Sequence, residues 1–255
     1  MQLGIQTIIF GKRTGEDLPG VLRDIKAAGY DGVEFGMGSR TPEEVLTLFR
    51  SENLAVCGYH AGYNTFTDPE ETKKQGKHLA AVGGKYLMCS GIEGWQKADR
   101  DAYLRSAENF NRAGAALREE GVHFCYHNHN WEFFPLADGG NGMDLLIAHT
   151  DPELVKLCPD VYWLACGGND PAAWIRQNAA RCVYFHFKDG TFDAATQQPT
   201  TFTELGRGAV DLVGAIAAVR ELNPEWVVTE QDRTEGDPAE SARISAEYAR
   251  TTLGI

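Results

Sequence analysis

The stretch CYHNHNWEFF, residues 125–134, places His127, His129 and Glu132 close together in the chain. Imidazole and carboxylate groups are the side chains that bind divalent ions or transfer protons near neutral pH. Three interpretations are open: a metal site, an acid–base cluster, or a polar rim on a hydrophobic strand. Which of them holds depends on where the stretch lies in the fold and on which polar groups other segments bring to it.

Acidic and imidazole groups also follow other short apolar runs. Each alone has an ordinary alternative, because a single polar residue at a strand end is commonly a hydrogen-bonded structural group. His123, which comes early in its run, is assigned to structure. Repetition along the chain is what indicates a shared site. The residues are Glu34, His60, the group His127, His129 and Glu132, then Asp160, His186 with Lys188 and Asp189, and Glu230 with Asp232.

The segments that must position these residues alternate between apolar runs and stretches with helical periodicity. Glycine at the ends of several periodic stretches, as in AAGYDGVEF and EEGVHFCY, is typical of a helix stop before a strand. Strands are expected at LGIQTII, GVEF, LAVCGYH, KYLMCS, VHFCYHNH, VKLCPDV, CVYFHFK and WVVTE. Helices are expected at about 16–28, 42–52, 69–82, 98–120, 142–149, 171–178, 209–222 and 238–252.

This alternation predicts an α/β fold, a (β/α)₈ TIM barrel in one domain over residues 1–255. Apolar runs suit parallel strands that are buried on both faces. A doubly wound open sheet is the alternative, but no G-x-G-x-x-G motif follows the first strand. The longest irregular segment, residues 189–208, is expected to be a functional loop. In a barrel all the polar strand ends meet at one face.

Composition narrows the class of protein. The formal net charge of −12 works against a nucleic-acid partner and favours a small-molecule substrate. The six cysteines form no C-x-x-C pair, so we expect reduced, buried thiols in a cytoplasmic protein. No basic segment precedes the apolar N-terminal residues, and no apolar run is long enough to span a bilayer. A homo-oligomer is an open possibility.

Four of the polar residues come from consecutive strands and form a candidate ligand set. Glu132, Asp160, His186 and Glu230 combine carboxylate oxygens with one imidazole. Such a set suits one divalent ion, Mn²⁺, Mg²⁺, Co²⁺ or Zn²⁺, with an open position for substrate oxygens.

The chain resembles the xylose isomerase-like TIM barrel family of sugar phosphate isomerases and epimerases, which shares its barrel with endonuclease IV (AP endonuclease family 2). The matching stretches, in family order, are GYDGVEF, YHNHNWEFF, PDVYWLACGGNDP, FHFKDG, ELGRGAVDL and VVTEQD. The resemblance implies one divalent ion held by Glu132, Asp160, His186 and Glu230. Many members carry a glutamate directly at the fifth strand end, where this chain reads YHNH, so that ligand is left open among Glu132, His127 and His129.

The resemblance also implies a reaction. A divalent ion that chelates a carbonyl and its neighbouring hydroxyl acidifies the C–H between them, which leads through an enediolate to isomerisation or epimerisation of a sugar or keto-sugar. Glu132 and Glu230 are implied as the two bases, with His127 and His129 as further acid–base groups. Substrate contacts are expected from Glu34, His60, Trp163, Lys188 and Arg207.

Three other functions compete with this one. A lyase or dehydratase acting on an inosose-like or 3-keto-glycoside substrate would use the same enediolate and expel a leaving group, for which the imidazoles of YHNH are suitable acids. An endonuclease IV-like nuclease needs a multi-zinc cluster and a basic groove, whereas this chain has seven histidines in all and is acidic. A catalytically silent sugar-binding protein would not need its ligand positions filled.

Overall fold

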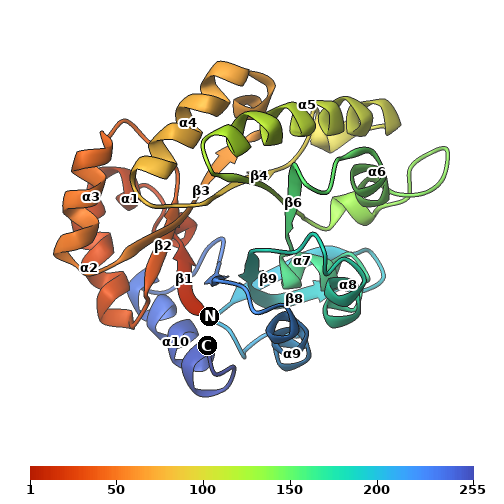
Figure 1. Ribbon diagram of the computed structural model, residues 1–255. Coiled ribbons are helices and arrows are strands. Elements are labelled where there is room, and N and C mark those ends of the chain that lie inside the picture. Colours follow the sequence, from red (N-terminus) through yellow and green to blue (C-terminus); the bar gives the residue numbers. More distant parts are fainter.

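A computed structural model gives the backbone of residues 1–255 and every side chain except that of Gln96. In this described part, eight parallel strands form the barrel and helices surround it (Figure 1). The strands are β1 (Gln2–Gln6), β2 (Gly32–Phe35), β3 (Ala55–Gly62), β4 (Tyr86–Ser90), β5 (His123–His127), β6 (Val155–Cys158), β7 (Phe185–Phe187) and β10 (Trp226–Thr229). The predicted (β/α)₈ barrel is confirmed.

The helices lie between successive strands as the periodicity predicts. The longer ones are α2 (Leu18–Ala28), α3 (Pro42–Ser51), α4 (Pro69–Ala81), α5 (Arg100–Glu119), α6 (Gly142–His149), α9 (Leu212–Leu222) and α10 (Pro238–Thr251). Shorter ones are α1 (Arg13–Glu16), α7 (Val161–Cys166), α8 (Pro171–Gln177) and the 3₁₀ helices η1 (Thr7–Phe10), η2 (Tyr63–Thr67), η3 (Trp95–Lys97) and η4 (Trp131–Phe133). The helix-stop glycines Gly29, Gly83 and Gly121 have the positive φ that the sequence indicates.

The barrel closes at the site itself. Strands pair in the order β6-β5-β4-β3-β2-β1-β10-β7. The two ends of this order, β6 and β7, meet through isolated parallel bridges, Leu157 with Cys182 and Asp160 with His186. Two of the predicted site residues therefore lie at the seam of the barrel.

The inside of the barrel is filled by large side chains, among them Trp226, Tyr184, Tyr86 and Met88. Gly32 makes room for this packing, because a Cβ there would lie 2.7 Å from both the Cys57 thiol and the Trp226 ring. All six cysteines are free and buried, as predicted. A second, larger core lies between the strands and the surrounding helices.

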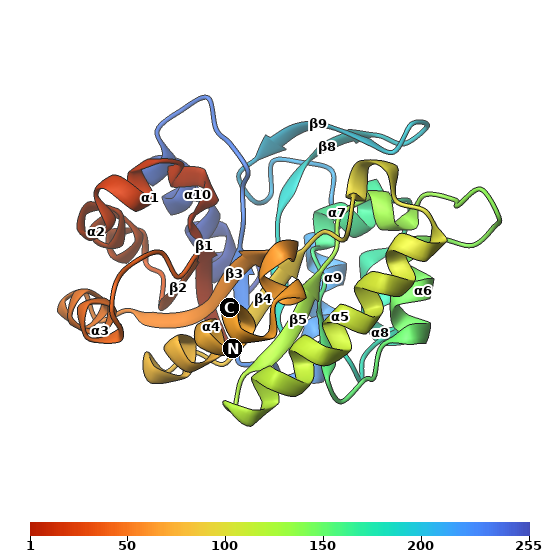
Figure 2. The same ribbon diagram turned by 90° about the horizontal axis from the view of Figure 1, so that it is seen from above.

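The segment 189–208 is more regular than the sequence indicates. Strands β8 (Asp189–Asp193) and β9 (Gln198–Thr203) form an antiparallel hairpin within it. The Asp193 carboxylate accepts hydrogen bonds from the backbone N–H groups of Ala195 and Thr196, which fixes the turn. The hairpin lies at the other end of the molecule from the two termini (Figure 2).

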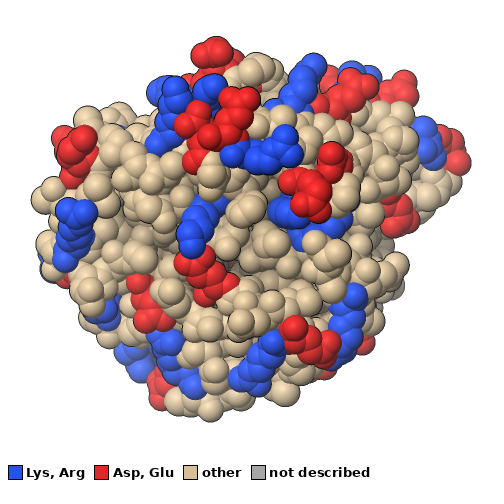
Figure 3. Space-filling model, in the orientation of Figure 1, with Lys and Arg blue, Asp and Glu red and all other residues tan. Residues whose placement is uncertain are grey.

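The surface and the helices give two further facts. Basic and acidic side chains lie next to each other over much of the face seen in Figure 3. Within the described residues, none of the helices combines the length and the apolar character that crossing a lipid bilayer requires.

Arg181 stabilises the closing seam from the side of β6. Its buried guanidinium donates hydrogen bonds to the carbonyls of Ile147 and Val155 and to the Thr150 hydroxyl. We expect Arg181→Met to lower the free energy of unfolding by about 3 kcal/mol, because these buried acceptors lose their donor. Urea denaturation followed by circular dichroism measures it.

The matched control is Arg176→Met. Arg176 forms an exposed, two-pronged ion pair with Glu221, so its loss is expected to change the free energy of unfolding by less than about 1 kcal/mol. Equal effects of the two substitutions would contradict the role given to Arg181.

Candidate active site

Four side chains from the last strands of the barrel meet in one buried cluster, which we call the ligand cluster: His127, Asp160, His186 and Glu230. One potential ligand atom of each lies within 4.8 Å of those of the others, and all four residues are buried. His127 ends β5, Asp160 follows β6, His186 is in β7, and Glu230 follows β10. The structure thus brings together three of the four predicted ligands.

The cluster contains buried atoms that have no hydrogen-bond partner among the described residues. They are His127 Nδ1, Asp160 Oδ2, His186 Nδ1 and Glu230 Oε2. His186 Nδ1 lies only 2.5 Å from Glu230 Oε2, but without the geometry of a hydrogen bond. Such buried polar atoms are costly unless something binds them. Two carboxylate oxygens and two imidazole nitrogens fit a divalent cation such as Zn²⁺, Mn²⁺ or Co²⁺.

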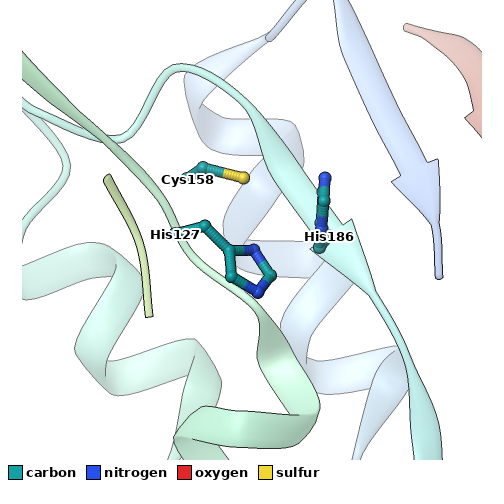
Figure 4. A group of neighbouring side chains, drawn as sticks. All are labelled: His127, Cys158 and His186. Carbon is teal, nitrogen blue, oxygen red and sulfur yellow. The ribbon is translucent and has the colours of Figure 1, made fainter. Parts of the chain in front are cut away.

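A second group of atoms overlaps with the first. Figure 4 shows the imidazole of His127 beside that of His186, with the Cys158 thiol above His127 and to the left of His186. The sulfur is also close enough to the two imidazoles to share a ligand position. Burial raises the pKa of the Cys158 thiol to about 11, so the thiol is protonated at neutral pH and is a poor ligand compared with the two carboxylates.

In three of the four residues of the ligand cluster, a second polar atom of the side chain forms a hydrogen bond that holds the side chain in place. Asp160 caps α7, since its Oδ1 accepts a hydrogen bond from the backbone N–H of Trp163 at 2.9 Å. Glu230 Oε1 accepts from the Lys188 ammonium at 3.2 Å. His186 Nε2 lies 2.7 Å from Glu34 Oε2. Each contact leaves the other polar atom of the side chain without a hydrogen-bond partner among the described residues.

Glu34 supports the cluster from behind. It is fully buried on β2, and its second oxygen accepts from His60 Nδ1 at 2.9 Å, while His60 Nε2 bonds to the Ser90 hydroxyl at 2.8 Å. Burial alone would raise the pKa of the Glu34 carboxyl, but His186 and His60 outweigh it and lower the pKa to about 2. Both oxygens are bound by imidazoles in the structure, and contact of Glu34 with substrate stays an expectation.

Carboxylate–histidine pairs of this kind orient metal-binding imidazoles, because the carboxylate fixes the proton on one nitrogen and leaves the other free for the ion. The chain Ser90–His60–Glu34–His186 has this form, with His186 Nδ1 as the free atom. Glu34 binds two imidazoles, those of His60 and His186. Of these, His60 is partly exposed, with 15% of its side chain accessible to solvent. Both of its nitrogens are bound, to Glu34 and to Ser90, and its contact with a substrate stays an expectation.

Glu132 lies outside the ligand cluster, and His127 takes its place. The Glu132 side chain on η4 accepts hydrogen bonds from the Tyr126 hydroxyl at 2.6 Å and from the backbone N–H of His129 at 2.8 Å. Burial raises the pKa of its carboxyl to about 7. The alternation of the strand explains the exchange: Cys125 faces the inside of the barrel, and so does His127 two residues later, whereas Tyr126 faces the outer core.

His129 stands beside the cluster and belongs to an aromatic stack. Its ring centroid lies 5.1 Å from that of His127 and 3.8 Å from that of Trp131, with which it stacks. Burial lowers the pKa of the His129 imidazole well below its usual value, so the ring is neutral at pH 7. Its Nδ1 is buried without a partner among the described residues, as is the Nε1 of Trp131 and of Trp163.

Lys188 is a buried ammonium next to the cluster. It bonds to Glu230 and Asp232 and lies 4.7 Å from the centre of the Trp163 ring. Burial lowers the pKa of the Lys188 amine, but the acidic neighbours outweigh burial and raise the pKa above its usual value. The positive charge is therefore permanent. Asp232 is one of the polar strand-end residues that the sequence selects, whereas Phe202, which also contacts Lys188, is a neighbour that the strand-end pattern does not select.

Arg207, which the sequence predicts as a substrate contact, makes its ion pair away from the ligand cluster. It is 56% exposed and pairs with Glu204 at 3.2 Å. The loop that carries it is held by the Asp189 carboxylate, which accepts backbone hydrogen bonds from Gly206 and Gly208. Nothing in the structure links Arg207 to the ligand cluster, so its substrate contact remains an expectation.

Comparison with known proteins agrees with this architecture. The family model described as xylose isomerase-like TIM barrel matches residues 22–252. Inosose dehydratase of Lacticaseibacillus casei is 24% identical, over 100% of this chain and 98% of that protein. A sugar phosphate isomerase/epimerase from Parabacteroides distasonis superposes with a TM-score of 0.83 at 21% identity, covering 99% of both chains. IolI protein with a bound zinc atom superposes with a TM-score of 0.76 at 16% identity, covering 100% of this chain and 98% of that one.

The identity of the fifth-strand ligand can be tested by metal content. We expect His127→Ala to reduce bound Zn²⁺ or Mn²⁺ strongly after dialysis, because His127 contributes an atom to the cluster. Glu132→Gln is expected to leave it unchanged. Plasma mass spectrometry gives the stoichiometry, with Asp160→Asn as a second cluster variant. Loss of metal in Glu132→Gln with an unchanged circular dichroism spectrum would return the ligand role to Glu132.

The supporting role of Glu34 leads to a separate prediction. Glu34→Gln keeps the size of the side chain but removes the charge that orients His186, so metal affinity should fall about 10- to 100-fold. Competition with a chromophoric chelator measures the affinity directly. Glu225→Gln, which breaks an exposed pair with Lys85, is the control. Unchanged affinity in Glu34→Gln would show that His186 is oriented without it.

Proposed function

Because the chain belongs to the xylose isomerase-like TIM barrel family, we propose that it is a divalent-metal-dependent enzyme that forms an enediolate from a keto-sugar or keto-polyol. The observation that carries the proposal is the set of four buried, unpartnered ligand atoms at the C-terminal ends of the barrel strands. In TIM barrel enzymes this end of the barrel holds the active site. Zn²⁺, Mn²⁺ and Co²⁺ suit the mixed nitrogen and oxygen donors.

A divalent ion held there would polarise the substrate carbonyl and acidify the neighbouring C–H. Glu230 is the candidate base for that C–H, and Lys188 holds its Oε1. The Lys188 ammonium also places a permanent positive charge where negative charge develops on substrate oxygens. Trp163 covers this ammonium and keeps water away from it.

The arrangement of acid–base groups favours dehydration as the outcome. Epimerisation by two metal-bound glutamates would need Glu132 at the cluster, but that carboxylate is bound to Tyr126 and the His129 backbone. The groups beside the cluster are the imidazoles of His129 and His60. An imidazole can relay to the departing hydroxyl group the proton that Glu230 removes, by accepting it on one nitrogen and releasing one from the other. The similarity to inosose dehydratase supports the same outcome.

Isomerisation is the second candidate. It needs only one base that moves a proton between adjacent carbons, and the unpartnered Oε2 of Glu230 meets that need. The two outcomes share the proton abstraction and differ in what happens to the enediolate: dehydration expels a hydroxyl group, while isomerisation conserves mass.

The setting of the enzyme is part of the proposal. We place it in the cytoplasm, as one domain over residues 1–255, acting on a small molecule and not on nucleic acid. The overall charge of −12 and the mixed charges in Figure 3 support a partner other than a phosphate backbone. Self-association into a homo-oligomer is compatible with this reading.

The reaction is tested by incubating the Mn²⁺- or Zn²⁺-loaded protein with inosose, with ketohexoses and with a disaccharide that carries a 3-keto group, in D₂O. We expect metal-dependent loss of the C–H signal next to the carbonyl, and loss of one water from inosose by mass spectrometry. Glu230→Gln should slow the exchange about 10²- to 10⁴-fold at saturating metal, because the amide cannot act as a base. Exchange at the wild-type rate would exclude Glu230 as the base, and absence of exchange in wild type would overturn the proposed reaction.

A further inference from the structure

Trp95 is a large apolar side chain that the ligand cluster does not use. It begins η3 in the loop after β4, and 46% of it is exposed. Few large apolar side chains are exposed to this extent in the described part of the chain. An exposed tryptophan on a loop at the active-site end of a barrel is a common anchor for a ligand.

An unbroken path of rings joins Trp95 to the ligand cluster. The Trp95 and Trp131 rings are 4.6 Å apart between centroids, Trp131 stacks on His129 at 3.8 Å, and His129 is 5.1 Å from His127. Since Trp131 covers part of the Trp95 indole, the remaining surface of that indole is held in a fixed orientation. A ligand that reaches from the cluster toward solvent on this side meets Trp95.

A hollow lies between Trp95 and Ser90, whose hydroxyl bonds to His60 behind the ligand cluster. Its volume is about 420 Å³, and its walls include Tyr63, Asn64, Thr65, Ser90 and Trp95. Ser90 bonds to His60, whose ring is 5.4 Å from that of His127, so the inner wall of the hollow adjoins the cluster. A hollow of this size accommodates a small ligand.

The chemistry of these walls selects the kind of ligand. None of the described residues that line the hollow carries a charged side chain. A phosphate group would need cations or several convergent N–H donors. One indole surface beside hydroxyl and amide groups is complementary to a pyranose, which has an apolar C–H face and a rim of hydroxyls. An aromatic group in the same place would offer no hydrogen-bond partner to the Asn64 side chain.

We infer that the substrate is an unphosphorylated keto-glycoside with two rings, whose second sugar ring binds in this hollow against Trp95. The inference rests on the proposed function for the first ring, which would occupy the ligand cluster. It narrows the substrate class from keto-sugars and keto-polyols in general to neutral compounds that extend at least one ring beyond the reacting one.

Binding without turnover tests this inference. The metal-loaded protein is titrated with cellobiose, maltose and trehalose, with the one-ring compounds glucose and myo-inositol, and with glucose 6-phosphate. Saturation-transfer NMR and tryptophan fluorescence report binding. We expect at least one disaccharide to bind roughly tenfold more tightly than the one-ring compounds, and Trp95→Ala to remove that difference, since truncation of an exposed tryptophan anchor commonly has an effect of this size.

Two controls accompany Trp95→Ala. Trp95→Phe keeps an aromatic surface and should retain most of the preference for the disaccharide. Val213→Ala removes an exposed apolar side chain, 55% accessible, that does not line the hollow, and should bind all sugars as wild type does. Metal content should be the same in all variants.

The results separate the two proposals. A disaccharide preference that survives in Trp95→Ala, no disaccharide preference in wild type, or tightest binding of glucose 6-phosphate would overturn the subsite. Disaccharide binding that depends on Trp95, together with no metal-dependent exchange of any keto-sugar in D₂O, would support the subsite and overturn the proposed reaction instead.

Discussion

Two carboxylates and two imidazoles share a buried space less than 5 Å across in this barrel, and the rest of the active-site end is arranged around their mutual repulsion and lost hydration. Removing such groups from water costs several kcal/mol each unless they are bound by opposite charge or by hydrogen bonds. The protein supplies such partners on the outside of the cluster only, through Glu34, Lys188 and the backbone N–H of Trp163. One polar atom of each residue of the cluster has no hydrogen-bond partner among the described residues, which is expected of a cation site.

The barrel seam and the cluster depend on each other. Asp160 and His186 are bridge partners across β6 and β7, where the ladder is reduced to isolated bridges. The closing contact of the fold thus joins two ligand residues directly. Glu34 reaches His186 from β2, on another part of the wall, so the orientation of one imidazole depends on strands that are distant in the strand order. A cation bound to the cluster would tie these strands together, which links metal binding to the stability of the barrel.

Much of this arrangement follows from the sequence, and the exceptions have physical causes. Apolar runs and helix-stop glycines identify the strands and helices, and the rule that strand ends meet at one face selects Asp160, His186 and Glu230. The ligand from the fifth strand could be chosen only by knowing which side chains of that strand point into the barrel, because His127 ends the strand and Glu132 follows it closely in the chain. Applying the two-residue alternation from Cys125 favours His127. The role of Glu34 could not be predicted, since it depends on a contact across the barrel with His186. The β8–β9 hairpin was hidden by its polar composition.

The exchange of a glutamate for His127 changes the electrostatics of the centre. With an ion bound, both imidazoles would be neutral and both carboxyl groups ionised, so the two negative charges of Asp160 and Glu230 would balance a divalent ion instead of exceeding it. Three carboxylates would leave a net negative centre that opposes negative charge on the substrate. A balanced centre, with the Lys188 ammonium beside it, stabilises an anionic enediolate more strongly. In the proposed reaction, an imidazole in place of a third carboxylate therefore favours the enediolate from which elimination would proceed.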